Sequence, residues 1–274
     1  MAVVSALQDA VDTLKRNPIL FVAATLYGLV QVPAWLLQIS GSPALQLVSS
    51  AYNLLLVFVF PFFMGGLLSM ALDGLTGSTS LSRFWSGGKQ YYLRLLAVSL
   101  LFFVVYFIVG FGVAFLVFAL VLGGVIGGGA GFGGVSLAVL AVIGIVGLLF
   151  ALVILVVGFL FQFYAQAIVV DDEGVIDSLK RSYSVVRQNL VTVIGFDVLA
   201  FVLGALISSI PIGYLFFTGA AFNQMSTAPL GVRLGFVLLS ILITIIIGAI
   251  GVTFTIAFYV RITASREGSG TAQL

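Results

Sequence analysis

The sequence contains 274 residues, of which 62% are hydrophobic and only 7% are charged. Soluble globular domains carry about 25% charged residues, so this composition excludes a water-soluble fold and predicts an integral membrane protein. Cysteine and histidine are both absent, which excludes disulfides and sites that depend on thiolate or imidazole groups. The net charge is only +2, and the basic residues lie beside apolar blocks without forming a basic domain, which excludes nucleic-acid binding.

A helix of about 20 apolar residues is long enough to cross the hydrocarbon core of a bilayer. Six blocks of the sequence meet that requirement, so we predict an all-α integral membrane protein with six transmembrane helices. In chain order the blocks are residues 18–39, 45–72, 92–122, 135–170, 190–212 and 231–262. The glycine-rich run 123–134, between the third and fourth blocks, predicts a turn because glycine destabilises a helix.

The distribution of basic residues predicts the orientation of these helices. If the N-terminus lies in the cytoplasm, ten Lys and Arg residues lie on the cytoplasmic side and only Arg233 lies on the opposite side. The ten are Lys15, Arg16, Arg83, Lys89, Arg94, Lys180, Arg181, Arg187, Arg261 and Arg266. Because short cytoplasmic loops are enriched in Lys and Arg, we predict a multi-pass cell-membrane protein with both termini in the cytoplasm.

The three cytoplasmic segments that precede the odd-numbered spans resemble one another when Asn17, Tyr91 and Asn189 are aligned as anchors. Twelve residues upstream of the anchors stand residues suited to a helix start, namely Ser5, Thr79 and Asp177. Six residues upstream stand Val11, Trp85 and Tyr183, and two residues upstream stand the basic residues Lys15, Lys89 and Arg187. We therefore predict a single transmembrane domain, residues 1–274, with three pseudo-repeats at about 1–78, 79–173 and 174–274.

The third of these segments has the periodicity of an amphipathic helix. Its apolar face consists of Val175, Ile176, Leu179, Tyr183 and Val186, and its polar face of Lys180, Arg181, Ser184, Arg187 and Gln188. The N-terminal segment repeats this pattern, whereas Gly87 and Gly88 interrupt it in the middle segment. Each repeat is therefore expected to consist of an interfacial amphipathic helix followed by a transmembrane hairpin.

The sequence leaves two interpretations of these interfacial helices. They anchor the flanking spans at the membrane surface, or they bind anionic lipid headgroups or a protein partner through their basic side chains. The candidate residues for the second role are Lys15, Arg16, Lys89, Lys180, Arg181 and Arg187.

Residues 164–174 (Tyr-Ala-Gln-Ala-Ile-Val-Val-Asp-Asp-Glu-Gly), followed by residues 178–183 and 187–189, resemble a motif of six-span prokaryotic membrane proteins. That group includes the membrane domain attached to some glycerophosphoryl diester phosphodiesterases and related archaeal stand-alone proteins. The resemblance implies the same six-span fold. The sequence contains no phosphodiesterase catalytic domain, so no active-site residue of that enzyme is carried over.

An ionisable residue inside a span is costly and is a functional hypothesis by default. Asp197 lies eight residues past Asn189, about 12 Å into the fifth span. Gln162 and Gln166 lie one helical turn apart in the fourth span, and Arg94 is able to reach inward and pair with Asp197. We therefore predict an intramembrane polar cluster of these four residues, which either satisfies itself and fixes helix packing or relays a proton or cation.

Several membrane enzymes are excluded by the residues that the sequence lacks. An intramembrane metalloprotease needs histidine ligands, an aspartyl protease needs two facing carboxylates, and a serine protease needs a base for its nucleophile. We therefore expect no enzymatic activity, no metal and no cofactor. The favoured function is a non-enzymatic protein that organises lipid or partner proteins through its cytoplasmic amphipathic helices. The alternative is a small transporter or channel with Asp197 in a proton or cation path.

Overall fold

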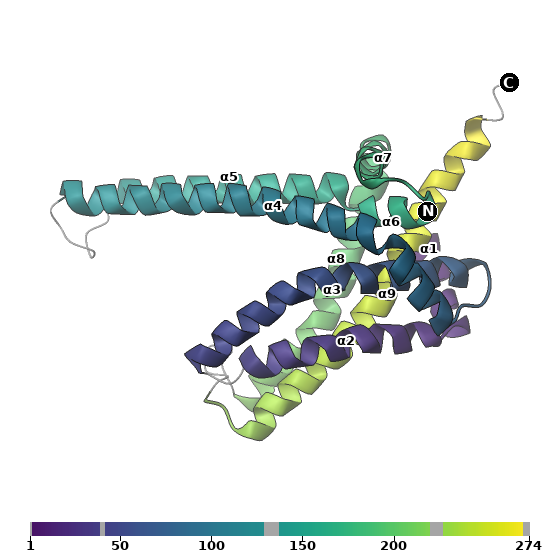
Figure 1. Cartoon of the computed structure of the whole chain (residues 1–274), viewed down its shortest axis with the longest axis horizontal. Helices are drawn as coiled ribbons and strands as arrows, with labels where there is room; N and C mark the ends of the chain where they lie inside the picture. Colours follow the sequence, from purple (N-terminus) through teal and green to yellow (C-terminus); the bar gives the residue numbers. More distant parts are fainter. Residues whose placement is uncertain (1, 39–41, 129–136, 220–226, 271–274) are drawn as a thin grey trace. The chain divides into compact units, whose positions relative to one another are not determined.

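The computed structural model describes residues 2–38, 42–128, 137–219 and 227–270 (Figure 1). Within these ranges the regular structure is entirely α-helical. Six segments are long and apolar enough to cross a membrane, so the chain is an all-α, multi-pass membrane protein. They are Ile19–Gln38, Pro43–Thr76, Leu81–Gly123, Val139–Val170, Leu190–Thr218 and Leu230–Ala264.

The described residues form helices α1 to α9. They are α1 (Ala2–Arg16), α2 (Ile19–Gln38), α3 (Pro43–Thr76), α4 (Leu81–Gly128), α5 (Leu137–Phe161), α6 (Tyr164–Val170), α7 (Val175–Gln188), α8 (Leu190–Thr218) and α9 (Leu230–Gly270). The two short amphipathic helices α1 and α7 match the predicted first and third interfacial segments. The fourth span is built from α5 and α6, which are separated by a turn at Gln162 and Phe163.

The middle interfacial segment differs from the prediction, because it is continuous with the third span as the single helix α4. Gly87 and Gly88 do not interrupt this helix; they allow it to pack closely against α3. A methyl group on Gly87 would overlap the side chain of Ser69, and one on Gly88 would overlap Phe62. The packing compensates for the low helix propensity of glycine.

The glycine-rich run after the third span also differs from the predicted turn. Helix α4 continues through Gly128, so the first half of the run is helical. The remainder of the run, residues 129–134, lies outside the described residues.

The contacts divide the chain into two compact units, and this division does not follow the three sequence repeats. Unit 2 is Ala97–Gln162, in which α4 and α5 form a hairpin. Phe102 packs against Phe161, and Gly110 faces the ring of Phe150. Most side chains of this hairpin are exposed and apolar, as expected for helices surrounded by lipid.

Unit 1 consists of Met1–Leu96 and Phe163–Leu274. Its core forms where α1, α7 and the start of α4 meet the ends of three spans. The buried stretches of those spans are residues 65–71 of α3, 165–169 of α6 and 256–259 of α9. An aromatic group joins α6, α8 and α9, with Phe196 stacked on Phe258 at a centroid distance of 4.3 Å and Phe163 packed against both. The part of unit 1 that carries most of its charged residues is therefore also its best-packed part.

Candidate functional site

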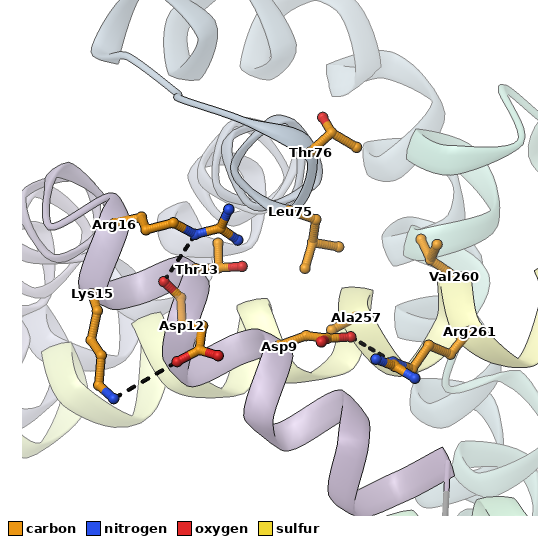
Figure 2. A pocket seen from close by; sticks show the side chains of 10 residues that line it. All are labelled: Asp9, Asp12, Thr13, Lys15, Arg16, Leu75, Thr76, Ala257, Val260 and Arg261. Atoms are coloured by element: carbon orange, nitrogen blue, oxygen red, sulfur yellow. Dashed lines mark hydrogen bonds and ion pairs between the residues drawn. The ribbon is translucent and has the colours of Figure 1, made fainter.

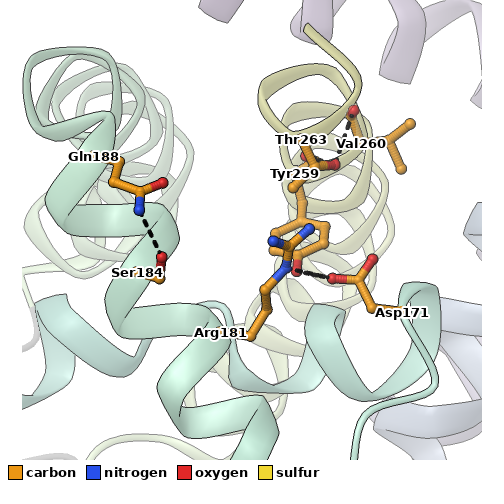
Figure 3. A network of polar contacts seen from close by, with 7 residues as sticks. All are labelled: Asp171, Arg181, Ser184, Gln188, Tyr259, Val260 and Thr263. Atoms are coloured by element: carbon orange, nitrogen blue, oxygen red, sulfur yellow. Dashed lines mark hydrogen bonds and ion pairs between the residues drawn. The ribbon is translucent and has the colours of Figure 1, made fainter. Parts of the chain in front are cut away.

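A partly buried polar network joins the end of α6 to α7 and α9 (Figure 3). Asp171 follows the last residue of α6, Arg181 lies on α7, and Tyr259 lies on α9. Arg181 Nε donates to Asp171 Oδ2 at 2.9 Å, and the Tyr259 hydroxyl donates to the same oxygen at 2.6 Å. One carboxylate therefore holds three helices together.

The charge of Arg181 is preserved in this setting. Burial lowers the pKa of its guanidinium, but the hydrogen bonds with Asp171 and Tyr259 and the negative charge of Asp171 outweigh burial and raise the pKa above its ordinary value. The Asp171–Arg181 contact is therefore a charge-assisted hydrogen bond.

The turn between α6 and α7 is held from a second side by Arg94 of α4. Arg94 Nη1 donates to Asp172 Oδ1 at 2.6 Å and to the Asp172 carbonyl oxygen at 2.9 Å. Asp172 has a φ of 54°, a left-handed conformation that aspartate tolerates better than most residues. The acidic motif at the end of the fourth span therefore binds two arginines from different helices.

Helix α7 lies with its small residues toward the protein. Ser178, Ser182, Val185 and Val186 are buried, and the backbone N–H of Phe163 donates to Ser182 Oγ at 3.1 Å. Two members of the predicted apolar face point outward instead, because Ile176 is 56% and Tyr183 is 40% exposed. The apolar face thus extends beyond the protein core.

The predicted lipid-facing or partner-facing cations occupy two kinds of environment. Five of them are exposed: Lys15, Arg16, Lys89, Lys180 and Arg187. Lys180 pairs with Asp177 one turn away at 2.9 Å, and both side chains are well exposed, so this pair contributes little to stability. Arg181 is the exception, since its guanidinium is engaged with Asp171 and Tyr259.

The four residues of the predicted intramembrane cluster come from different parts of the chain, and the cluster stays a prediction. Asp197 is partly buried on α8, and Gln166 is buried in α6. Gln162 lies in the turn between α5 and α6. Arg94 bonds to Asp172 at the end of the fourth span, in place of the expected pairing with Asp197.

Besides the Arg94–Asp172 pair, sequence reasoning missed three ion pairs at the charged ends of the spans. Two of them have the same spacing of ten residues, Asp73 with Arg83 and Asp171 with Arg181, with Nε–Oδ2 distances of 3.0 and 2.9 Å. The third joins Asp9 of α1 to Arg261 of α9. The common spacing of the first two pairs relative to the anchors Tyr91 and Asn189 is the signal that would have revealed them.

A charged pocket of about 720 Å³ lies between α1, α3 and α9, next to the third ion pair (Figure 2). Asp9, Asp12 and Arg16 of α1 line it on one side, and Val260 and Arg261 of α9 line it on another. Arg16 Nε donates to the carbonyl oxygen of Asp12 at 3.3 Å. Among the described residues, no group of three or more His, Cys, Asp or Glu side chains is arranged to hold a metal ion.

Residues 1–262 match the family model described as Domain of unknown function (DUF7847). The chain belongs to that family. The match covers all six candidate spans except the last two residues of the sixth. No curated protein and no solved structure matches the chain.

Proposed function

We propose that this chain is a non-enzymatic membrane protein that organises anionic lipid at the cytoplasmic face of the bilayer through its three interfacial segments. One observation carries the proposal: each segment presents an exposed apolar side chain and, four residues later, an exposed basic one. The pairs are Val11 with Lys15, Trp85 with Lys89, and Tyr183 with Arg187. We call them the three apolar–basic pairs.

The composition of these pairs suits the membrane interface. Residues four apart lie on the same face of a helix, so each pair offers one group to acyl chains and one to headgroups. Trp85 and Tyr183 are 53% and 40% exposed, and these residue types are enriched where hydrocarbon meets water. A Lys or Arg near an anionic surface contributes about 1 kcal/mol. Three cations on one protein therefore amount to a sizeable preference for anionic lipid.

The orientation that we propose places these pairs in the cytoplasm. Its support is the distribution of charge, with ten basic residues on the proposed cytoplasmic side and only Arg233 opposite.

The proposal is tested with a triple variant, Lys15→Gln, Lys89→Gln and Arg187→Gln. The protein is placed in nanodiscs that contain phosphatidylglycerol and phosphatidylcholine, then extracted gently, and native mass spectrometry counts the retained phosphatidylglycerol. We expect the variant to retain several-fold less than the parent. The matched control, Lys15→Arg, Lys89→Arg and Arg187→Lys, keeps every charge and should behave as the parent does.

Two outcomes would favour other functions. Equal retention by the neutral and charge-preserving variants would contradict lipid organisation, and a protein that co-purifies with the parent but not with the neutral variant would favour a partner-binding role. Proton or cation flux through the reconstituted parent would favour the alternative in which Asp197 on α8 lies in a transport path.

A further inference from the structure

The three ion pairs at the span ends are equivalent by position. In each pair one residue lies eight positions before an anchor, and the other follows the buried end of an even-numbered span. The pairs are Asp73–Arg83, Asp171–Arg181 and Arg261–Asp9. In the first two the span end is acidic and the interfacial segment is basic, whereas in the third these charges are exchanged.

The burial of the interfacial segments supports this equivalence. The positions seven, four and three before the anchor are buried in all three segments. They are Ala10, Thr13 and Leu14 in α1, Phe84, Gly87 and Gly88 in α4, and Ser182, Val185 and Val186 in α7. Each interfacial segment therefore docks on a span end with the same face, and we call each such contact a joint.

The three joints differ in how the chain connects them. At two of them the chain runs directly from the span end into the interfacial segment, and the paired residues are ten positions apart. At the third, the paired residues Asp9 and Arg261 are 252 positions apart in the sequence. Nothing but non-covalent contact brings α1 to α9, although the fold offers two other span ends of the same kind.

The exchanged charges distinguish the end of α9 from the other two span ends. If α1 docked on the end of α3 or α6, Asp9 would face Asp73 or Asp171, and if another segment docked on α9, its arginine would face Arg261. Like charges in such contacts are unfavourable, and this is how closely related helices are kept to their correct partners. We propose that Asp9 and Arg261 are specificity-determining residues. Their reversed polarity directs the N-terminal helix to α9 and so completes the third joint.

This inference goes beyond the proposed function, because it concerns which surfaces pair within the protein and does not depend on what the exposed faces bind. The charged pocket of Figure 2 lies at the third joint, where no turn of the chain connects the two paired helices. Asp12, one turn from Asp9 on the same helix, pairs only weakly with Lys15 at 3.7 Å and offers a control for charge alone.

The absence of cysteine makes docking of α1 measurable. Ala10 on α1 and Val186 on α7 are both 0% exposed, so the single substitutions Ala10→Cys and Val186→Cys report the docking of each helix as protection from a thiol-reactive maleimide. Each is combined with Asp9→Arg, Arg261→Asp, both changes together, or Asp12→Arg, in the full chain in nanodiscs.

We expect Asp9→Arg and Arg261→Asp each to speed labelling at position 10 by about fivefold, the size expected when a partly exposed ion pair becomes repulsive. The double exchange restores an ion pair at α9 but gives it the polarity of the other two joints, so labelling at position 10 should fall between the parent and single-variant rates. Asp12→Arg should leave the parent rate unchanged, and labelling at position 186 should stay slow throughout. Three results would overturn the inference: a double exchange that labels at the parent rate or as fast as the single variants, single variants that label as slowly as the parent, or parallel acceleration at position 186.

Discussion

Tyr259 shows how much one hydroxyl contributes at the charged end of this protein. Its side chain is fully buried in α9, and its hydroxyl reaches the carboxylate of Asp171, which also accepts from Arg181. The carboxylate of Asp171 is partly buried, and such donors compensate for its reduced contact with water. The network is therefore a fixed connection between the turn after α6 and the last span.

Removing that hydroxyl should weaken the protein measurably. Tyr259→Phe keeps the ring and its packing but deletes a hydrogen bond to a charged acceptor, so we expect a loss of about 1–3 kcal/mol in the free energy of unfolding. Thermal or denaturant unfolding in detergent measures the effect. Tyr183→Phe on the exposed face of α7 is the matched control, and equal behaviour of the two variants would argue against a stabilising role for the Tyr259 hydroxyl.

For individual residues, the sequence revealed the acidic motif more readily than the side chains that bind it. The run of acidic residues after the fourth span was recognisable as a motif, yet its partners Arg94 and Tyr259 lie 78 and 88 positions away. Arg94 was expected at Asp197, because depth along a helix is readable from a sequence but direction around the bundle is not. Only the packing of α4 against the α6–α7 turn determines where that guanidinium points.

Helix α4 is the element in which local propensity and tertiary packing disagree. Gly87 and Gly88 favour a break in an isolated peptide, but both are buried against α3 within an unbroken helix. A periodicity argument sees only the break. Space for a neighbouring backbone is a property of two helices together, and no single segment displays it.

The close approach of α4 and α3 can be tested with alanine. A methyl group on Gly88 would meet both the ring and the backbone carbonyl oxygen of Phe62, so Gly88→Ala should destabilise the protein by about 1–2 kcal/mol, since overpacking outweighs the gain in helix propensity. Gly112 of the same helix faces open space, and Gly112→Ala should cause no loss. Both are compared by thermal unfolding, and a stabilising Gly88→Ala would contradict the packing.

The amphipathic helices illustrate a different limit of pattern reading. The periodicity of α7 predicted a helix and its two faces, and the helix spans Val175–Gln188. It did not reveal that the serines face the protein while Ile176 and Tyr183 face outward. Hydrophobicity alone does not distinguish a core-facing residue from a lipid-facing one, because both environments are apolar.

For the whole molecule, composition and apolar run length were sufficient to predict the six spans and the all-α class. The number of spans and the helical class follow from the lipid surroundings, and the apolar side chains along each span all reflect those surroundings. The division into two units, one of them the α4–α5 hairpin, was not predictable, because both hairpin helices are as apolar as the spans of the other unit. The threefold repeat stays a prediction from the sequence, and the ion pairs became apparent only from the contacts at the joints.

The central claim is that the three apolar–basic pairs lie together on the cytoplasmic side of the membrane. Single cysteines introduced by Lys15→Cys, Lys89→Cys and Arg187→Cys, with Arg233→Cys as the opposite-side control, have no background because the chain contains no cysteine. A membrane-impermeant maleimide added to intact cells should label only position 233, and positions 15, 89 and 187 should react only after permeabilisation. Labelling of any of these three from outside intact cells would contradict the account.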